Sequence, residues 1–342
     1  MAVDFHNSLV HMMRLKLEHW INRQWYLHGK ICHLFAPLSF LYKKVTNAGE
    51  IPLSQKLPTP VWVVGNLTVG GSGKTPFIIA MARLAAERGL RVLVVTKPYR
   101  IKHKLSKTTF IESALEPKVF GDEPCLIKAQ TKADVLCIAK SRQDIKKYTK
   151  HYDLILCDDG LQDHTLQRSV NWVVVNNQRG FGNGHLIPRG PMRTALKWSN
   201  RIDHVVERGK SQESALGYTL TVDLIYALDT NNPCDIAILK NKNILIACGL
   251  GHPDGFFDEV LKLGIQGETM AYPDHHVFSK ADINYFRSFD AVIISEKDAV
   301  KVKSFNLSHV YVTKTNIHSN NNLSNLVMDL LNAITESDTI MA

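Results

Sequence analysis

The sequence predicts an α/β fold in which a parallel sheet carries a phosphate-binding loop. Short apolar runs alternate with helical patterns over residues 61–176, which is the pattern of successive βαβ units. A glycine-rich turn follows the first of these runs and ends in Gly73-Lys74-Thr75. A second α/β segment starts at residue 244, and a length of 342 residues favours two domains over one.

Residues 1–45 form an N-terminal segment that is both apolar and basic. Leu9, Met13, Leu17 and Trp20 recur at helical spacing, and six lysines and arginines face only two acids there. Such a stretch is typical of a helix lying in a membrane interface, and a helical hairpin packed on the next domain is the alternative. No run of eighteen or more apolar residues predicts a membrane span, and no signal peptide is evident, so we expect the catalytic part in the cytoplasm.

The chain is basic, with a net charge of +9 and a pI of about 9.1. A basic excess indicates nucleic acid, an anionic membrane surface or a phosphorylated substrate as a partner. Since the sequence has no basic run interleaved with aromatic residues and no nucleic-acid motif, we expect no nucleic-acid partner. The six cysteines form no C-x-x-C pair, which favours free thiols in a reducing compartment.

The strand expected at 61–66 leads into the glycine-rich loop, and a helical pattern follows from 77 to 88. Glycines allow backbone N–H groups to approach phosphate oxygens, and the start of a helix adds a positive end. In such a loop, Lys74 neutralises the outer phosphates and Thr75 places its hydroxyl on Mg²⁺. The complete pattern has a glycine where this chain has Thr68, so a merely structural turn is the alternative. The candidate nucleotide-binding residues are Gly70, Gly71, Ser72, Gly73, Lys74 and Thr75.

An acid pair follows one of the later strands of this segment. Further strands are expected at 91–96, 135–139, 153–158 and 172–176. Asp158 and Asp159 stand at the end of the third of these, where carboxylates of a parallel sheet face the ligand-binding crevice. They are candidate Mg²⁺ ligands downstream of a phosphate-binding loop, and a helix cap or turn is the alternative.

Two further stretches carry residues suited to acid–base chemistry. Asp122 and Glu123 precede a helical pattern, where an N-cap is the default interpretation from that stretch alone. In residues 272–278, Asp274 stands next to two histidines, of which His275 is the first. Two interpretations of His275 remain open: a residue that orients a catalytic base, and a loop histidine with no catalytic part. A metal site is not supported, because no further ligands follow at the spacing that metals require.

The remaining segments suggest a binding loop and a second sheet. Residues 178–193 form a long irregular loop whose three arginines could clamp phosphates or lie on a solvated surface. Residues 217–228 alternate and resemble one arm of a hairpin, because a turn signal follows them. Beyond them, strands are expected at 244–251, 291–298 and 310–313. The loop arginines are Arg179, Arg189 and Arg193.

Taken together in order, these motifs resemble one family, tetraacyldisaccharide 4′-kinase, the lipid A kinase of Gram-negative bacteria. Each motif alone is weak, whereas the ordered series is specific and spans roughly residues 31 to 301. The series is Pro37–Tyr42, Gly65–Pro76, Gly121–Pro124, Asp158–Gln162, Phe181–Pro188, Gly190–Arg193, Gly249–Gly251, Pro273–His276 and Ser295–Lys301.

The resemblance implies an enzyme that transfers the γ-phosphate of ATP, with Mg²⁺, to the 4′-hydroxyl of tetraacyldisaccharide 1-phosphate. It implies two α/β/α sandwich domains of the P-loop NTPase type, joined by a two-stranded β linker, and an N-terminal membrane-associated helix at the cytoplasmic face of the inner membrane. We expect a monomer. The expected boundaries are 1–45 for the membrane-associated segment, 46–215 for the kinase domain, 216–243 for a β-hairpin linker and 244–342 for the second domain.

The resemblance also assigns roles to single residues. Lys74 and Thr75 keep their phosphate-loop roles, and Asp158 and Asp159 match the acidic pair near Mg²⁺. Catalytic residues are then expected to be Asp122, as the base that takes the sugar hydroxyl proton, His275, as its partner, and Lys74.

The chain departs from the family pattern at two places and leaves other functions open. Lys97-Pro98 replaces the usual Arg-Gly, and Thr194 stands where the family has an acid. One alternative function is a membrane-associated P-loop ATPase or GTPase switch acting on a protein partner. Another is a nucleotide-binding module that has lost catalysis.

Overall fold

The computed structural model describes residues 17, 20–27, 29–46, 57–98, 105–112, 115–163, 167–194, 202–209 and 215–341. Within these residues the strands are β1 (Val61–Gly65), β2 (Val92–Thr96), β3 (Thr109–Phe110), β4 (Asp134–Cys137), β5 (Leu154–Asp158), β6 (Val170–Asn176), β7 (His204–Arg208), β8 (Leu216–Ala227), β9 (Pro233–Cys234), β10 (Ile244–Cys248), β11 (Glu268–Ala271), β12 (Ala291–Ile294) and β13 (Val310–Ser319). They form one mixed sheet in the order β11-β10-β12-β13-β8-β7-β6-β1-β5-β2-β4-β3, with β9 beside β8. The prediction of an α/β fold is confirmed.

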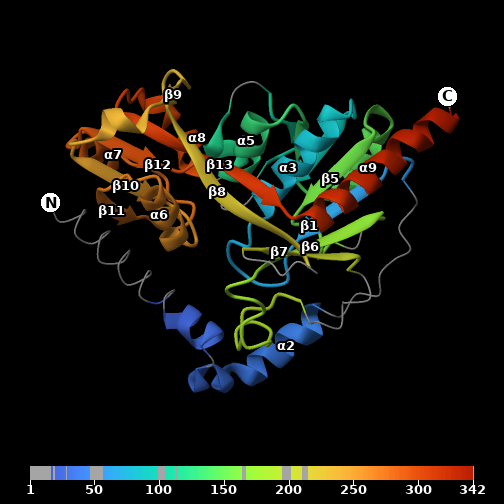
Figure 1. The fold of residues 1–342 in the computed structure, drawn as a ribbon. Helices are drawn as coiled ribbons and strands as arrows, with labels where there is room; N and C mark the ends of the chain where they lie inside the picture. Colours follow the sequence, from blue (N-terminus) through green and yellow to red (C-terminus); the bar gives the residue numbers. More distant parts are fainter. Residues whose placement is uncertain are drawn as a thin grey trace.

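The helices connect these strands and cover the sheet (Figure 1). The α-helices are α2 (Ala36–Thr46), α3 (Lys74–Glu87), α4 (Pro117–Phe120), α5 (Asp122–Gln130), α6 (Pro253–Lys262), α7 (Lys280–Phe286), α8 (Glu296–Val302) and α9 (Asn321–Met341). The 3₁₀ helices are η1 (Lys30–Phe35), η2 (Arg142–Lys147), η3 (Thr149–His151), η5 (Ile236–Leu239) and η6 (Lys303–Phe305).

The first half of the sheet is parallel from β7 through β6, β1, β5 and β2 to β4, and the short β3 is antiparallel at its edge. Strands β1, β2 and β5 are buried at every position, because side chains on both of their faces meet packed elements. Trp62 and Val64 of β1 face α3, α5 and α9, whereas Val61 and Val63 face the side of η2 and the 178–193 loop. This burial on both faces explains why the strands read as continuous apolar runs.

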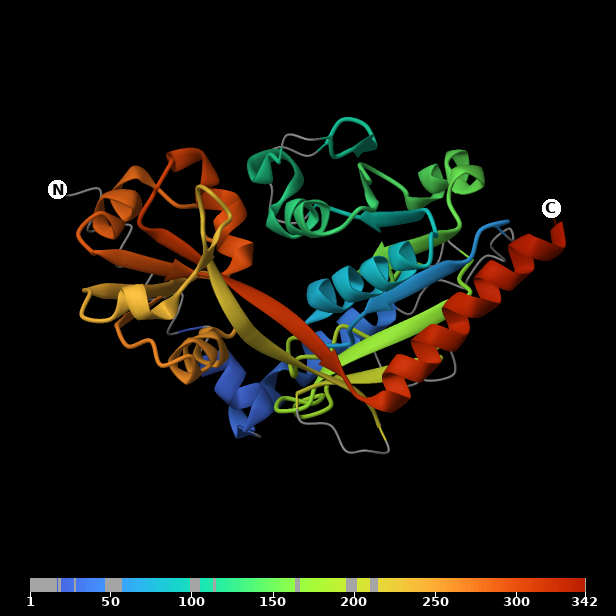
Figure 2. The same cartoon turned by 45° about the horizontal axis from the view of Figure 1, so that its top comes forward.

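The second half of the sheet is also parallel, from β11 through β10 and β12 to β13. Helices α7 and α8 cover one of its faces, and α6 covers the other. The two halves are joined where β13 runs antiparallel to β8 from Tyr311↔Ala227 to Ser319↔Tyr218. Figure 2 shows these two long strands crossing the middle of the molecule.

The link between the halves differs from the expected hairpin at 216–243. β8 does form a local hairpin, but its partner β9 pairs with only Ile225 and Tyr226. Its main partner is β13, which lies far along the chain and gave no local turn signal toward β8. The expected second domain, 244–342, includes α9. In the structure, α9 instead returns to the first half and buries Leu323, Val327 and Leu331 in its core.

The described residues of the N-terminal segment dock on the 178–193 loop, at the lower edge of the molecule in Figure 1. The Trp25 indole N–H donates to the Pro188 carbonyl at 3.1 Å, and the Ser39 hydroxyl donates to the Leu186 carbonyl at 2.9 Å. The expected helical positions Leu9 and Met13 lie outside the described residues. In the described part of the chain, no helix is long and apolar enough to cross a membrane.

Candidate functional site

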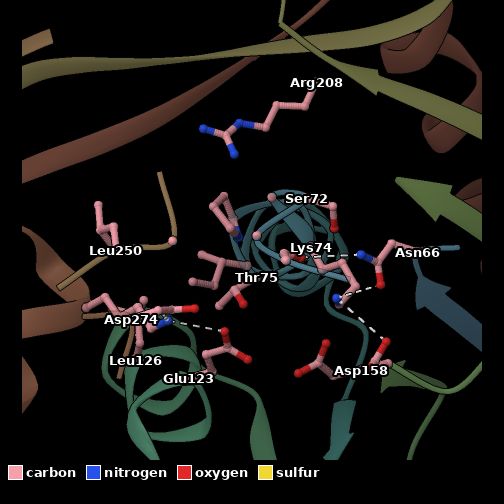
Figure 3. A pocket seen from close by; sticks show the side chains of 18 of the residues that line it. Asn66, Ser72, Lys74, Thr75, Glu123, Leu126, Asp158, Arg208, Leu250 and Asp274 are labelled. Carbon is pink, nitrogen blue, oxygen red and sulfur yellow. Dashed lines mark hydrogen bonds and ion pairs between the residues drawn. The ribbon is translucent and has the colours of Figure 1, made fainter. Parts of the chain in front are cut away.

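A cavity of about 800 Å³ opens at the carboxyl ends of β1 and β5 and faces the loops of the second half of the sheet. Open α/β sheets bind ligands at this edge. All six residues of the predicted phosphate loop line the cavity, and residues from the second half, among them His275 and Lys297, line it as well. Asp274 and Leu250 of this second wall face the loop in Figure 3. The site is therefore shared by the two halves.

The phosphate loop takes a conformation that depends on its glycines, and it leads into α3. Gly70 and Gly73 have φ angles of +102° and +96°, which favour glycine over residues with a side chain. Helix α3 begins at Lys74 without a side-chain cap, which leaves the positive end of the helix toward the cavity. The Tyr218 hydroxyl of β8 donates to the Gly73 carbonyl at 2.7 Å. The linker strand thus fixes the loop directly.

Lys74 points along the loop toward the acid pair (Figure 3). Its Nζ atom donates to Asn66 Oδ1 at 3.0 Å and lies 3.6 Å from Asp159 Oδ1. Asn66 is itself buried at the end of β1, so it sets the direction of the lysine. The ammonium is placed to meet the outer phosphates of a nucleotide on the loop.

The two acids after β5 have different surroundings. Asp158 is buried, accepts from the Thr96 hydroxyl at 3.3 Å through Oδ2, and has no hydrogen-bond partner for Oδ1 among the described residues. Burial raises the pKa of Asp158 to about 7, helped by Glu123 and opposed by Lys74. Such a carboxyl gains from a cation beside its unpaired oxygen.

Asp159 instead forms a two-pronged ion pair with Arg193. The guanidinium donates to Oδ1 at 2.7 Å and to Oδ2 at 2.9 Å. Burial would raise the pKa of Asp159, but the hydrogen bonds from Arg193 and the charge of Lys74 hold it well below its ordinary value. Both oxygens of Asp159 are therefore already engaged.

The residues present fit Mg²⁺ at the position of Asp158. The Thr75 hydroxyl and the Asp158 carboxylate both line the cavity and supply the hard oxygen atoms that Mg²⁺ prefers. Both oxygens of Asp159 accept hydrogen bonds from Arg193, so a cation bound there would share this carboxylate with the guanidinium. No group of three or more His, Cys, Asp or Glu is arranged around a metal position in the described residues. Mg²⁺ is commonly held by one or two carboxylates together with substrate phosphates.

Asp122 and His275 meet across the two halves of the sheet. Asp122 is the first residue of α5, and His275 lies in the loop after β11. The His275 Nδ1 atom is 2.8 Å from Asp122 Oδ1 and 3.0 Å from Oδ2, although the residues are 153 positions apart. Asp122 is buried behind the imidazole, and it is His275 that lines the cavity.

A lysine that the sequence analysis did not single out completes this cluster. Lys297 Nζ lies 2.9 Å from Asp274 Oδ1, 3.5 Å from Glu123 Oε1 and 3.7 Å from Asp122 Oδ2. Burial would raise the pKa of Asp122, but the hydrogen bond from His275 and the charge of Lys297 hold it well below its ordinary value. The carboxyl of Asp122 is thus ionised at neutral pH.

The three arginines of the 178–193 loop separate in the structure. Arg193 enters the cavity, Arg179 stacks over the Tyr26 ring at 5.5 Å, and Arg189 contacts His33 of the N-terminal segment. The cavity residues that were not predicted as site residues from the sequence include Lys297 and Arg208. Lys297 lies within the family motif Ser295–Lys301, whereas Arg208, at the end of β7, belongs to no motif. Lys97 and Pro98, one departure from the family pattern, also line the cavity.

The site defines a P-loop phosphotransferase. It has a phosphate loop at the end of β1, a carboxylate at the end of the neighbouring β5, and an Asp–His pair on the opposite wall. The family model described as tetraacyldisaccharide-1-P 4′-kinase, LpxK, matches residues 31–332. The chain belongs to this family of kinases of lipid A biosynthesis.

Similar proteins cover most of the chain. The tetraacyldisaccharide 4′-kinase of Shewanella halifaxensis is 32% identical over 299 residues, which cover 84% of this chain and 90% of that protein. The enzyme of the same name from Haemophilus influenzae is 35% identical over 291 residues, which cover 82% and 87%. A crystal structure of LpxK from Aquifex aeolicus in complex with ATP has a TM-score of 0.69 at 24% identity, over 89% of this chain and 99% of that one. The last comparison supports the fold.

Proposed function

We propose that the chain transfers the γ-phosphoryl group of ATP to the 4′-hydroxyl of tetraacyldisaccharide 1-phosphate within this cavity. The observation that carries the mechanism is the Asp122–His275 pair on the wall opposite the phosphate loop. A donor phosphate and an acceptor hydroxyl held on facing walls are in the arrangement that in-line transfer requires.

The donor half consists of the loop from Gly70 to Thr75. Its glycines let backbone N–H groups approach the phosphates, and Lys74, directed by Asn66, neutralises charge on the outer phosphates. Thr75 and Asp158 would hold Mg²⁺, which supplies neutralisation of the phosphate charge when bound. Arg193 keeps Asp159 as an ionised carboxylate next to Lys74.

The acceptor half consists of Asp122 and His275. Phosphoryl transfer depends mainly on positioning and charge, but the acceptor hydroxyl must still lose its proton as its oxygen bonds to phosphorus and the bond to the leaving ADP breaks. The Asp122–His275 pair takes that proton, and the ionised carboxylate of Asp122 keeps the imidazole oriented. His275 borders the cavity, so the pair acts on the acceptor as one unit.

The chain is best divided into two units with one joint. The first unit contains β1–β7 and also α9, the second contains β10–β12 with α6–α8, and β8 with β13 joins them. The cavity lies between these units, so a change in their angle changes the separation of donor and acceptor.

The N-terminal segment is proposed to contact an anionic membrane surface at the cytoplasmic face. Leu27, Leu34 and Val45 are 71%, 79% and 78% exposed, and Lys43 and Lys44 follow the apolar residues of α2. Exposed apolar side chains with a basic flank are typical of an interfacial anchor. The same segment docks on the 178–193 loop, so membrane contact would place the cavity near lipid headgroups.

The decisive experiment incubates purified protein with labelled ATP, Mg²⁺ and tetraacyldisaccharide 1-phosphate. We expect label in the lipid, and a fall of about 10²–10⁴-fold in kcat for Asp122→Asn with nucleotide binding retained. Asp329→Asn, on the exposed face of α9, is the matched control. Unlabelled lipid beside an active reference kinase would reject the proposal. Unchanged kcat in Asp122→Asn would leave Asp122 as a structural partner of His275 and Lys297 only.

Membrane contact has its own test in vesicle flotation. Leu34→Glu with Leu38→Glu should reduce binding to vesicles containing anionic lipid, because both side chains are exposed on the proposed membrane face. Ile238→Glu, which is 51% exposed on the second unit, serves as the control. Equal flotation of both variants would indicate that the segment only packs on the protein.

A further inference from the structure

The histidine that meets Asp122 has an unfavourable backbone conformation. His275 has a φ angle of +64°, in the left-handed region that residues other than glycine seldom adopt. Its Nδ1 atom nevertheless lies 2.8 Å from Asp122 Oδ1, which belongs to the other unit. A conformation of this kind persists only where the surrounding structure holds it in place. The contacts that hold His275 are therefore to be sought in the loop around it.

The next residue, His276, packs against both ends of this loop. Its ring stacks on the Tyr272 ring, with 4.5 Å between the centroids, and meets the Phe278 ring edge-on at 5.1 Å. Tyr272 and Phe278 are both buried, so these contacts are anchored in the core of the second unit. The backbone N–H of His276 donates to the Pro273 carbonyl at 3.0 Å. This hydrogen bond closes the turn that contains His275.

A hydrogen bond fixes the same ring to the start of α7. His276 Nε2 lies 3.1 Å from Asp282 Oδ2. That oxygen also accepts from the backbone N–H and the hydroxyl of Ser279, both at 2.7 Å, in the capping box of the helix. Burial would raise the pKa of Asp282, but the hydrogen bonds from His276 and Ser279 lower it below its ordinary value. An ionised carboxylate only accepts hydrogen bonds, so Nε2 of His276 carries the proton.

We propose that His276 is a positioning residue, which holds His275 in its left-handed conformation with the imidazole directed at Asp122. The inference rests on the proposed kinase function, because it is there that the Asp122–His275 pair takes the acceptor proton. His276 is not among the described residues that line the cavity, so it acts through His275 and not on a substrate. Without its contacts the turn relaxes to a negative φ, which directs the His275 side chain away from Asp122.

The kinetic test uses His276→Phe, which keeps an aromatic ring in the stack and removes the hydrogen bond to Asp282. We expect kcat to fall about 10–100-fold through lost orientation, at unchanged KM for ATP, because the phosphate loop lies in the other unit. Asp282→Asn keeps an oxygen for the helix cap and should cause a smaller fall. If both act through one contact, the double variant should be no slower than His276→Phe. His309→Phe, which removes another half-buried histidine packed on α7, is the matched control.

A spectroscopic measurement separates this inference from the proposed function, because it needs no turnover. In protein with isotope-labelled histidine, the Nδ1 proton shared with Asp122 should give a downfield NMR signal, which is assigned by its loss in His275→Asn. We expect His276→Phe to shift or broaden this signal and His309→Phe to leave it unchanged. An unchanged signal in His276→Phe overturns the inference, as does absence of the signal in wild-type protein. Absence of label transfer by wild-type protein would instead reject the kinase proposal. Unfolding temperatures show that each variant is folded.

Discussion

Replacement of Lys297 by methionine tests the charge cluster that joins the two units. The ammonium of Lys297 lies within 3.7 Å of Asp274, Glu123 and Asp122, and its side chain is 14% exposed. Methionine keeps most of the apolar stem and removes the charge, so it leaves three carboxylates without their shared cation. The carboxylates come from both units, so the loss is expected to weaken the contact between the units.

The size of the effect follows from what remains around each carboxylate. Loss of one partner of a fully buried ion pair costs about 3–5 kcal/mol. Asp122 keeps His275 at 2.8 Å and Lys301 at 3.9 Å, and the side chains of Asp274 and Glu123 are 27% and 35% exposed. Solvent and the remaining partners reduce the cost, so we expect a loss of about 2–3 kcal/mol in the free energy of unfolding.

Urea unfolding followed by circular dichroism and tryptophan fluorescence measures this loss. Lys280→Met, on the exposed first turn of α7, removes an equal charge that has no buried partner among the described residues, and it is the matched control. We also expect a lower kcat in Lys297→Met, because Asp122 loses part of the charge that holds it ionised. If Lys297→Met unfolds at the same urea concentration as Lys280→Met, the cluster does not stabilise the fold and the argument fails.

Three further substitutions probe other parts of the molecule. Lys74→Ala should weaken binding of a fluorescent ATP analogue at least 10-fold, since its ammonium is the loop's charge for the outer phosphates; unchanged affinity would contradict the donor site. Tyr218→Phe removes the hydrogen bond to Gly73 and should cost about 1 kcal/mol in unfolding and raise KM for ATP, whereas a change in stability alone would confine it to packing. Leu331 of α9 is fully buried, so Leu331→Ala should cost about 2–5 kcal/mol in the free energy of unfolding; an equal effect of Asn332→Ala, at an exposed position, would place α9 outside the core.

Much of the first unit was predictable because its signals are local. Strands β1, β2 and β5 are buried on both faces, so their sequences are uninterrupted apolar runs that the prediction placed within a residue or two. The phosphate loop was predictable because its backbone conformation requires glycine, and Gly70 and Gly73 do adopt positive φ angles. The joint between the units was not, because β8 pairs with a strand about ninety positions later, which no turn residue announces.

The sequence by itself determined the α/β class, the phosphate loop at residues 70–75 and, through the ordered motifs, the kinase family. Only the tertiary structure decided which charges face one another. It brings Asp122 into contact with His275 across 153 positions. It pairs Asp159 with Arg193, whereas one oxygen of Asp158 has no partner among the described residues. Arg208 has no carboxylate partner in the described part of the chain. The reason is physical: backbone preferences act over a few residues, whereas a charge acts on whatever group the fold places within a few ångströms.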